Sequence, residues 1–228
     1  MFENNQLQQT ITERLLLAVI MLALVALVLL VLGTSPVAQA AAITANSADN
    51  TVADDGICTL QEAITAANTD TALGVTPGEC AVGSGADSIK LGLALIYLLD
   101  EVDNFFEGEN GLPSISTDIT INGGSSTIAR SVEVGTPEFR FLYVEASRDL
   151  KLNDLTLTSG SAQDSNGEAI RSVGSITITN SALTGNTAVR GGAINNDGTL
   201  TLVDSTIRNN PGARSGGGII NNGVASSV

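Results

Sequence analysis

Four aspartates in the second half of the sequence carry the side chains best suited to catalysis. They are Asp154, Asp164, Asp197 and Asp204. A glycoside hydrolase acts with two carboxylates, and the distance between them decides whether the product retains or inverts its configuration. Histidine is absent from the whole chain, which excludes acid–base catalysis by imidazole. The chemistry to be weighed is therefore carboxylate chemistry on a polysaccharide.

A polysaccharide lyase would instead combine calcium-binding acids with a basic residue, for which Arg190 and Arg214 are the candidates. Both arginines precede a Gly-Gly pair, and Asp154 and Asp204 share one repeat position with Asn180. Side chains whose positions follow a repeat are more typical of a scaffold than of an active site. We therefore expect no catalytic residue here, and an enzyme similar to pectate lyases or polygalacturonases is the alternative.

Three further acids, Asp49, Asp54 and Asp55, stand close together before the first cysteine. Carboxylate oxygens are ligands that calcium accepts, so these residues are weak candidates for a calcium site. They lack the spacing and the glycine of an EF-hand loop. The alternative, which we favour, is that Asp55 stabilises the start of a following helix through the helix dipole. No other cofactor is expected.

The N-terminal forty residues differ from the rest of the chain. Residues 15–32 are an unbroken apolar run that follows Arg14, and Ala38 and Ala40 form a small-residue motif behind it. This order is typical of a secretory signal peptide cleaved before Ala41. The run is nearly long enough to span a bilayer, so an uncleaved N-terminal membrane anchor is the alternative.

Cys58 and Cys80 are the two cysteines of the chain. An even pair in an exported protein predicts a disulfide. A zinc site would need more cysteine or histidine ligands than the sequence offers. The pairing would close a loop near the start of the exported part and stabilise it.

The C-terminal half of the chain repeats itself with a period of about 24 to 26 residues. Leu150, Ile176 and Leu200 correspond in the alignment of the repeats. Each repeat has an alternating segment followed by a glycine-rich one. The segments are "LKLNDLTLTSG" and "GEAIRSVG", "ITITNSALTGN" and "GGAINNDG", and "LTLVDSTIRNN" and "GGGIINNG".

Alternation of apolar and polar residues predicts half-buried strands. A single strand of this kind cannot bury its apolar face, so successive repeats must stack. The predicted fold is all-β, a right-handed parallel β-helix. Gly191-Gly192 and Gly216-Gly217 recur at one corner, where a positive φ or a close approach of two coils would exclude a side chain. The aligned pairs Asn180/Asp204 and Asn186/Asn210 are expected to form side-chain ladders between coils.

One short helix is predicted at 59–68, ahead of the strands. Thr59 and Glu62 form a capping box, and Leu60, Ala63, Ile64 and Ala67 share one face. So short a helix needs an apolar surface to cover. We expect it to close the open first coil of the β-helix, which would otherwise expose a strand edge.

The stretches "DDGICTLQEAITAAN", "GADSIKL" and "GLPSISTDITING", with Cys80 between the first two, resemble the CSLREA domain of exported bacterial proteins. The "GGAINN" and "GGGIINN" segments are similar to the right-handed β-helix repeats of chlamydial polymorphic outer-membrane proteins. Thr59 and Gln61 stand where the family motif has Ser and Arg, so any ion pair of that Arg is lost. The resemblance implies export and a β-helix, and it implies no established catalytic residue.

Together these patterns predict a signal peptide at 1–40, an N-terminal cap at 41–112 and β-helix coils at 113–228. The last residues follow a Gly-Gly corner, so we expect the coils to continue in a longer protein. With 24 acidic and 10 basic residues the net charge is −14, which argues against nucleic acid as a partner.

The predicted function is binding or adhesion at the cell surface. The predicted location is extracellular or on the cell surface, and association with the outer membrane is one form of the latter. A surface polysaccharide or a protein of a host or neighbouring cell is the expected partner. Contact with a membrane is expected only through the N-terminal segment or an anchor beyond Val228. A purely structural stalk is a further alternative.

Overall fold

The computed structural model describes residues 14–22, 40–166, 169–190, 192–215 and 217–227. The chain divides into two units, Met1–Ala38 and Gln39–Val228, and the second of these is compact. In the first unit residues 14–22 are helical. No helix among the described residues is both long enough and apolar enough to cross a membrane. Most of the predicted signal or anchor segment lies outside the described residues, so that prediction stays open.

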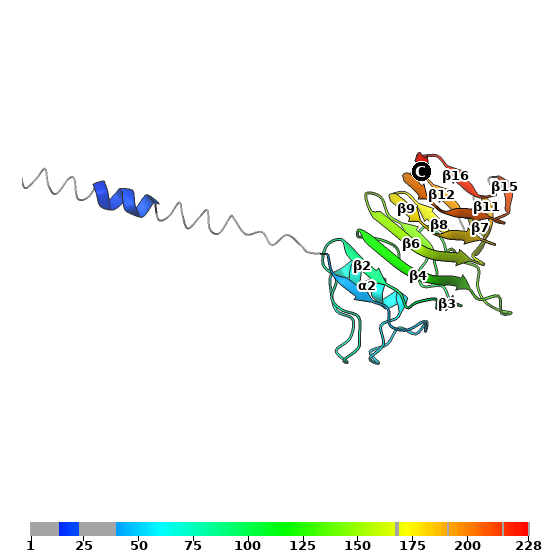
Figure 1. Cartoon of the computed structure of the whole chain (residues 1–228), viewed down its shortest axis with the longest axis horizontal. Coiled ribbons are helices and arrows are strands. Elements are labelled where there is room, and N and C mark those ends of the chain that lie inside the picture. The colour runs from blue at the N-terminus through cyan, green and yellow to red at the C-terminus, as the bar shows by residue number, and fades with distance from the viewer. Residues whose placement is uncertain (1–13, 23–39, 167–168, 191, 216, 228) are drawn as a thin grey trace, which may run out of the picture. The chain divides into compact units, whose positions relative to one another are not determined.

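The described residues of the second unit form many strands and the helix α2 (Figure 1). The first elements are β1 (Ala42–Thr44), α2 (Leu60–Thr69), β2 (Asp87–Lys90), β3 (Ile96–Leu99), β4 (Ile119–Arg130), β5 (Leu142–Val144) and β6 (Asp149–Thr158). The elements that follow are β7 (Ser161–Asn166), β8 (Ile170–Ser172), β9 (Ser175–Thr179), β10 (Ala182–Thr184), β11 (Thr187–Arg190), β12 (Ile194–Asn196), β13 (Thr199–Val203), β14 (Thr206–Arg208), β15 (Gly212–Ser215), β16 (Ile219–Asn221) and β17 (Val224–Ser227).

The strands form three parallel sheets. The largest has the order β1-β2-β4-β6-β9-β13-β17, with β3, β10 and β14 paired beside this path. The two smaller sheets have the orders β15-β11-β7 and β16-β12-β8-β5. From β6 to β17 the chain visits the three sheets in one fixed order and then returns to the first. The structure is therefore mostly β with long parallel sheets, an arrangement compatible with a stacked solenoid.

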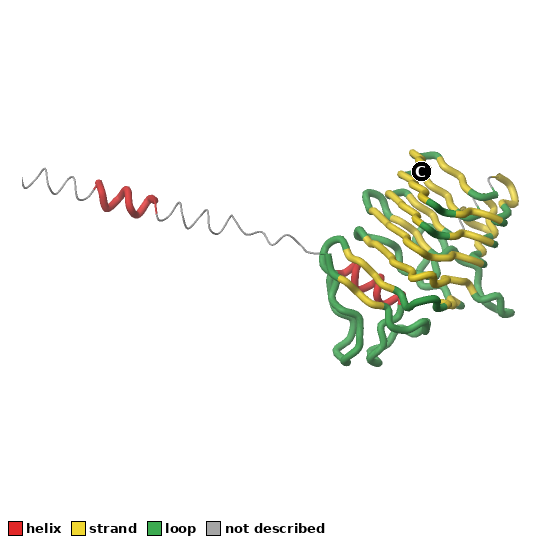
Figure 2. Tube along the Cα trace, viewed as in Figure 1, coloured by secondary structure: helices red, strands yellow, loops and turns green. Residues whose placement is uncertain are grey.

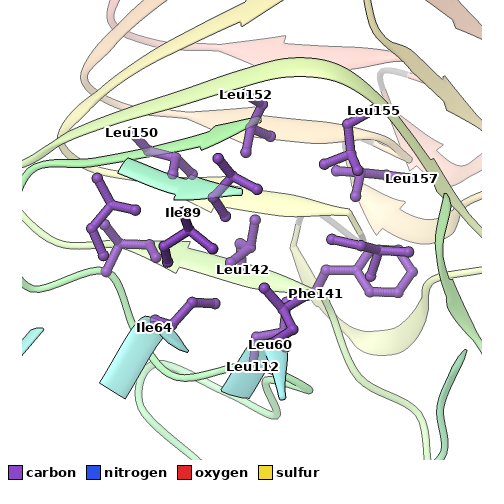
Figure 3. Packing of buried hydrophobic residues seen from close by; sticks show 14 of the residues in the cluster. Leu60, Ile64, Ile89, Leu112, Phe141, Leu142, Leu150, Leu152, Leu155 and Leu157 are labelled. Carbon is purple, nitrogen blue, oxygen red and sulfur yellow. The ribbon is translucent and has the colours of Figure 1, made fainter. Parts of the chain in front are cut away.

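The register of the strands follows the repeat of the sequence. Leu150 pairs with Ile176, and Ile176 pairs with Leu200. These three residues are 0 to 2% exposed, whereas the residues between the apolar positions of each strand are more accessible. The period of two therefore places one apolar row inside the stack, as predicted for half-buried strands. Figure 3 shows Leu150 of this row among the buried apolar residues, with Ile89 and Ile64 below it in the view.

The helix α2 lies beside β1 and β2 at the first strands of the stack (Figure 2). Thr59 is the N-cap, and the predicted capping box with Glu62 is present. Leu60 and Ile64 are fully buried and join the same apolar cluster as Ile89 (Figure 3). The helix ends one residue later than predicted, at Thr69, because Asp70 takes the left-handed conformation and ends it there.

The disulfide predicted between Cys58 and Cys80 is present, with a Cα–Cα distance of 4.7 Å. Both cysteines are buried. Cys58 immediately precedes the N-cap of α2, so the bond ties the start of the helix to the segment that leads into β2. A covalent link and a capping box thus define the beginning of the same short helix.

The glycine corner is explained by close packing. A Cβ on Gly192 would overlap the carbonyl oxygen of Gly217 and would lie 2.5 Å from that of Asn210. The close approach of coils is therefore the correct alternative for Gly192. Gly191 and Gly216 lie outside the described residues.

Candidate functional site

A shallow polar groove of about 350 Å³ runs across the bends of the largest sheet. We call it the corner groove. The corner groove crosses successive repeats, and each repeat contributes a polar residue from the same bend. Its lining includes Ser125, Asp154, Thr156, Asn180, Asp204 and Thr206.

The bends that form the groove come from four residues with positive φ. Ser125 has a φ of 61°, Asp154 of 53°, Asn180 of 48° and Asp204 of 47°. Asn and Asp adopt this left-handed region more readily than other residues with a side chain. Asn180 separates β9 from β10, and Asp204 separates β13 from β14. The repeat therefore selects residues that turn the backbone and at the same time carry polar groups.

The two carboxylates in the groove have different surroundings. Asp154 accepts hydrogen bonds from the Ser125 hydroxyl at 3.1 Å and from the Asn180 amide at 3.3 Å. The carboxylate of Asp204 is exposed and has no hydrogen-bond partner among the described residues. Asn180 lies between them, so two strand spacings, about 9.5 Å, separate their backbones.

Serine hydroxyls fix the floor of the groove. The Ser181 hydroxyl accepts a hydrogen bond from the backbone amide of Leu155 at 3.1 Å, one coil away. The Ser205 hydroxyl accepts one from the backbone amide of Ser181 at 3.2 Å. These bonds cross between coils where the strand ladder is interrupted by the bend. They hold the positive-φ residues in line along the groove.

The other predicted ladder is internal. Asn186 is 0% exposed and Asn210 is 5% exposed. The Asn186 amide donates to the side-chain oxygen of Asn210 at 3.0 Å and to the Leu157 carbonyl at 3.2 Å. The Gly160 amide donates to the side-chain oxygen of Asn186 at 2.9 Å. These asparagines therefore join three coils from the inside and are closed to a ligand.

The remaining carboxylates do not join the groove. Asp197 forms an ion pair with Arg171 and accepts a hydrogen bond from the Asn222 amide at 2.8 Å. The Asn222 hydrogen bond, with the Arg171 contact second, lowers the pKa of Asp197 below its usual range. This residue clamps neighbouring coils. The side chains of Asp164, Arg190 and Arg214 lie outside what the structure describes.

The acids considered as calcium candidates form hydrogen bonds within the N-terminal loops. Asp54 accepts hydrogen bonds from the backbone amides of Val75 and Thr76, at 3.2 Å and 3.0 Å. Hydrogen bonds from Thr76 lower the pKa of Asp54. Asp55 accepts a hydrogen bond from the Ile57 amide at 3.0 Å. That amide precedes α2, so Asp55 forms a local turn ahead of the helix. Its interaction with the helix dipole stays a prediction.

In the part of the chain that the structure describes, no group of three acidic, cysteine or histidine side chains is placed to hold a metal. Asp49 shows only a backbone hydrogen bond, to the Ser47 hydroxyl at 3.0 Å. The structure therefore gives no support to a calcium site at Asp49, Asp54 and Asp55.

Ser125 is the groove residue that the repeat pattern misses. It follows two glycines, Gly123 and Gly124, in an irregular stretch of β4 where the pairing register with β6 shifts. The glycines hide the alignment because they break the alternation of apolar and polar residues. The signal that could have identified Ser125 is its place in the sequence, a serine four residues after the apolar strand residue Ile121.

Comparison with known proteins identifies no relative. No family model, no curated protein and no solved structure matches the chain. The resemblance to the CSLREA domain therefore stays a prediction from the residues.

Proposed function

We propose that the chain is an exported surface protein that binds an extended, hydroxyl-rich polymer along the corner groove, without catalysis in this segment. Its fold would be a right-handed parallel β-helix whose first coil is closed by a CSLREA-like cap. The disulfide Cys58–Cys80 supports export, because disulfides persist in oxidising compartments outside the cytoplasm.

The observation that carries the binding proposal is the repetition of polar groups along the groove. Ser125, Asp154, Asn180 and Asp204 occupy the same bend of successive coils, about 4.8 Å apart from one strand to the next. A polymer with regularly spaced hydroxyl groups can meet such a row with many weak hydrogen bonds. A row of this kind offers hydrogen-bond acceptors and donors without a deep pocket for a single small molecule.

The charges of the groove restrict the polymer. Asp154 and Asp204 are acidic, and among the described residues no Lys or Arg lines the groove. A polyuronate would bring its carboxylates against these two and be repelled. A neutral polysaccharide, whose hydroxyls donate to the Asp204 carboxylate, suits the groove better.

A second candidate function, hydrolysis of a polysaccharide, has one observation in its favour. Asp154 and Asp204 face one groove from strands that are two spacings, about 9.5 Å, apart. Inverting glycosidases likewise present two carboxylates to one groove. Both acids, however, lie at equivalent repeat positions, and the middle position between them is filled by Asn180. A site that merely follows the repeat favours binding over hydrolysis.

The test is binding of the protein to a panel of immobilised neutral polysaccharides and polyuronates, with soluble sugar released into the medium measured in parallel. We expect at least one neutral polysaccharide to bind and none to be cleaved. The variant Asp204→Asn should bind three- to tenfold more weakly, because it loses a charged acceptor. Thr177→Ala, on the outer face of β9 and outside the groove, is the matched control and should bind as the parent does.

Two results would contradict the proposal. If no neutral polysaccharide binds, or if binding is insensitive to Asp204→Asn, the groove is not the binding surface. If a bound polysaccharide releases new reducing ends and Asp204→Asn abolishes the release, the protein is a hydrolase and the non-catalytic proposal is wrong.

A further inference from the structure

A buried carboxylate lies directly at the predicted processing site. Asp87, the first residue of β2, is 1% exposed. Its Oδ1 atom accepts hydrogen bonds from the backbone nitrogen of Ala41 at 2.9 Å and from that of Ser84 at 2.9 Å. Ala41 is the residue that would become the N-terminus if the leader were cleaved after the Ala38 and Ala40 motif.

The carboxylate of Asp87 is incompletely satisfied. Its Oδ2 atom is buried and has no hydrogen-bond partner in the part of the chain that the structure describes. Among the described residues no lysine or arginine forms an ion pair with it. Oδ2 faces Gly83, where an added Cβ would lie 2.6 Å from it, so no larger side chain could stand there. A buried carboxylate without a cation is costly, and its environment calls for a positive charge.

The backbone already holds Ala41 in place for this role. The Ala41 carbonyl accepts a hydrogen bond from the Ser88 amide at 2.8 Å, and the next residue begins β1, which pairs with β2 in parallel. The nitrogen of Ala41 is thus fixed against Asp87 by the sheet register and needs no rearrangement. Ala40 is exposed, so the chain leaves the buried site at the bond that would be cut.

We propose that cleavage between Ala40 and Ala41 creates an α-ammonium group that forms an ion pair with the buried carboxylate of Asp87 and locks β1 onto β2. Hydrolysis of this peptide bond adds one water, leaves the new carboxylate on Ala40 and converts the Ala41 amide to a protonated amine. The amide offers one N–H, whereas the ammonium offers three and a positive charge. The inference rests on the export part of the proposed function and adds a stabilising role for the processed N-terminus.

The ion pair predicts a pH dependence with a definite sign. An unperturbed α-amino group has a pKa of about 7.7–8.0. A buried carboxylate partner raises this pKa in the folded protein. The stabilisation is then fully present below about pH 7.7 and is lost as the pH rises through the higher pKa of the folded state. Groups that face Ala41 across this contact are Asp87 itself and the backbone of Ser84 and Ser88.

The first experiment is to express the full chain in a bacterium with active export, and to determine the N-terminus of the recovered protein by intact mass and N-terminal sequencing. We expect the chain to begin at Ala41. A recovered protein that retains the leader, or begins elsewhere, overturns the inference. Polysaccharide binding measured on the same preparation tests the proposed function separately, so the two failures are distinguishable.

The second experiment measures the reactivity of the α-amine. The processed protein is treated with acetic anhydride between pH 6 and pH 10, and acetylation of the N-terminus, Lys90 and Lys151 is followed by mass spectrometry. We expect the α-amine to react at least tenfold more slowly in the folded protein than in urea. The midpoint of its rate against pH should lie one pH unit or more above that of an ordinary α-amine. Lys90 and Lys151, which are exposed, serve as internal controls.

Variants assign the effect to the carboxylate. Asp87→Asn keeps the shape but removes the charge, and it should return the reaction midpoint to that of an ordinary α-amine. Glu133→Gln, an exposed acid elsewhere in the second unit, is the control and should leave the midpoint unchanged. If Asp87→Asn does not fold, the pH profile of the parent decides alone. A parent α-amine with an ordinary midpoint overturns the inference.

Discussion

Replacement of Asn186 by alanine should destabilise the central coils strongly. The substitution leaves the Gly160 amide and the Leu157 carbonyl without their side-chain partner, and the side-chain oxygen of Asn210 loses one of its donors. Gly160 and Asn186 are both buried, so bulk water does not reach these groups in the parent protein. A buried polar group left without a partner costs about 1–3 kcal/mol. With two such groups, the free energy of unfolding should fall by about 2–5 kcal/mol.

The assay is urea unfolding followed by circular dichroism, together with hydrogen exchange of the Gly160 amide. Stacked repeats are stabilised mainly by their neighbours, so exchange reports the local effect even where unfolding is not two-state. A local loss of about 2 kcal/mol corresponds to roughly 30-fold faster exchange at Gly160. The effect should spread to the coils on either side, because the Asn186 side chain bonds in both directions.

The matched control is Asn180→Gly in the exposed ladder. Glycine accepts the positive φ of this bend without strain, so only the side chain and its 3.3 Å hydrogen bond to Asp154 are removed. We expect a loss below about 1 kcal/mol. If Asn186→Ala costs no more than this control, and the exchange of Gly160 is unchanged, the internal ladder does not hold the coils together and the reasoning is wrong.

Three further outcomes are expected. Reduction of Cys58–Cys80, which are 22 residues apart, should lower the free energy of unfolding by about 3 kcal/mol, measured as the shift of the urea midpoint with and without dithiothreitol; no shift would show that the capping box alone fixes α2. Gly192→Ala should lower the free energy of unfolding by about 1–3 kcal/mol, because the added Cβ meets backbone carbonyls. Gly218→Ala should lower it less in the same unfolding assay, because its Cβ would meet only a methyl group of Ile207 at 3.4 Å. Because the pKa of Asp197 is lowered, its contribution to the free energy of unfolding is present above the usual aspartate pKa and is lost as the pH falls through the lower folded value. The side chain is 39% exposed, so Asp197→Asn should decrease the loss of stability between neutral and acid pH by less than about 1 kcal/mol. An acid-unfolding profile identical to that of the parent would contradict this role.

Most of the architecture could be predicted from local patterns. The alternation in "ITITN" and "LTLVD" determines which residues face inward, and the repeat determines which of them meet in register, as the pairing of Ile176 with Leu200 shows. The capping box of Thr59 and Glu62 needs only residues three positions apart. The disulfide followed from the number of cysteines. Each of these features depends on short-range spacing or on strict repetition, which a sequence displays directly.

The roles of the aligned polar residues could not be predicted in the same way. Asn180 and Asn186 are both repeat positions in one short segment, yet one is exposed in the corner groove and the other is fully buried. The difference comes from the backbone, since the positive φ of Asn180 turns its strand and Asn186 follows that turn. Asp54, a weak calcium candidate in the sequence, likewise accepts hydrogen bonds from the amides of Val75 and Thr76, more than twenty positions along the chain.

The sequence by itself therefore determined the strands, their stacking and the capped helix, because these depend on the period of apolar residues and on local hydrogen bonds. Only the tertiary structure decided which polar residues face solvent and which face the interior, because a bend of a few residues changes the side on which the next ones lie. It also brought Asp87 against Ala41, a contact between residues 46 positions apart. Such contacts depend on how strands meet in space, and no local pattern contains that information.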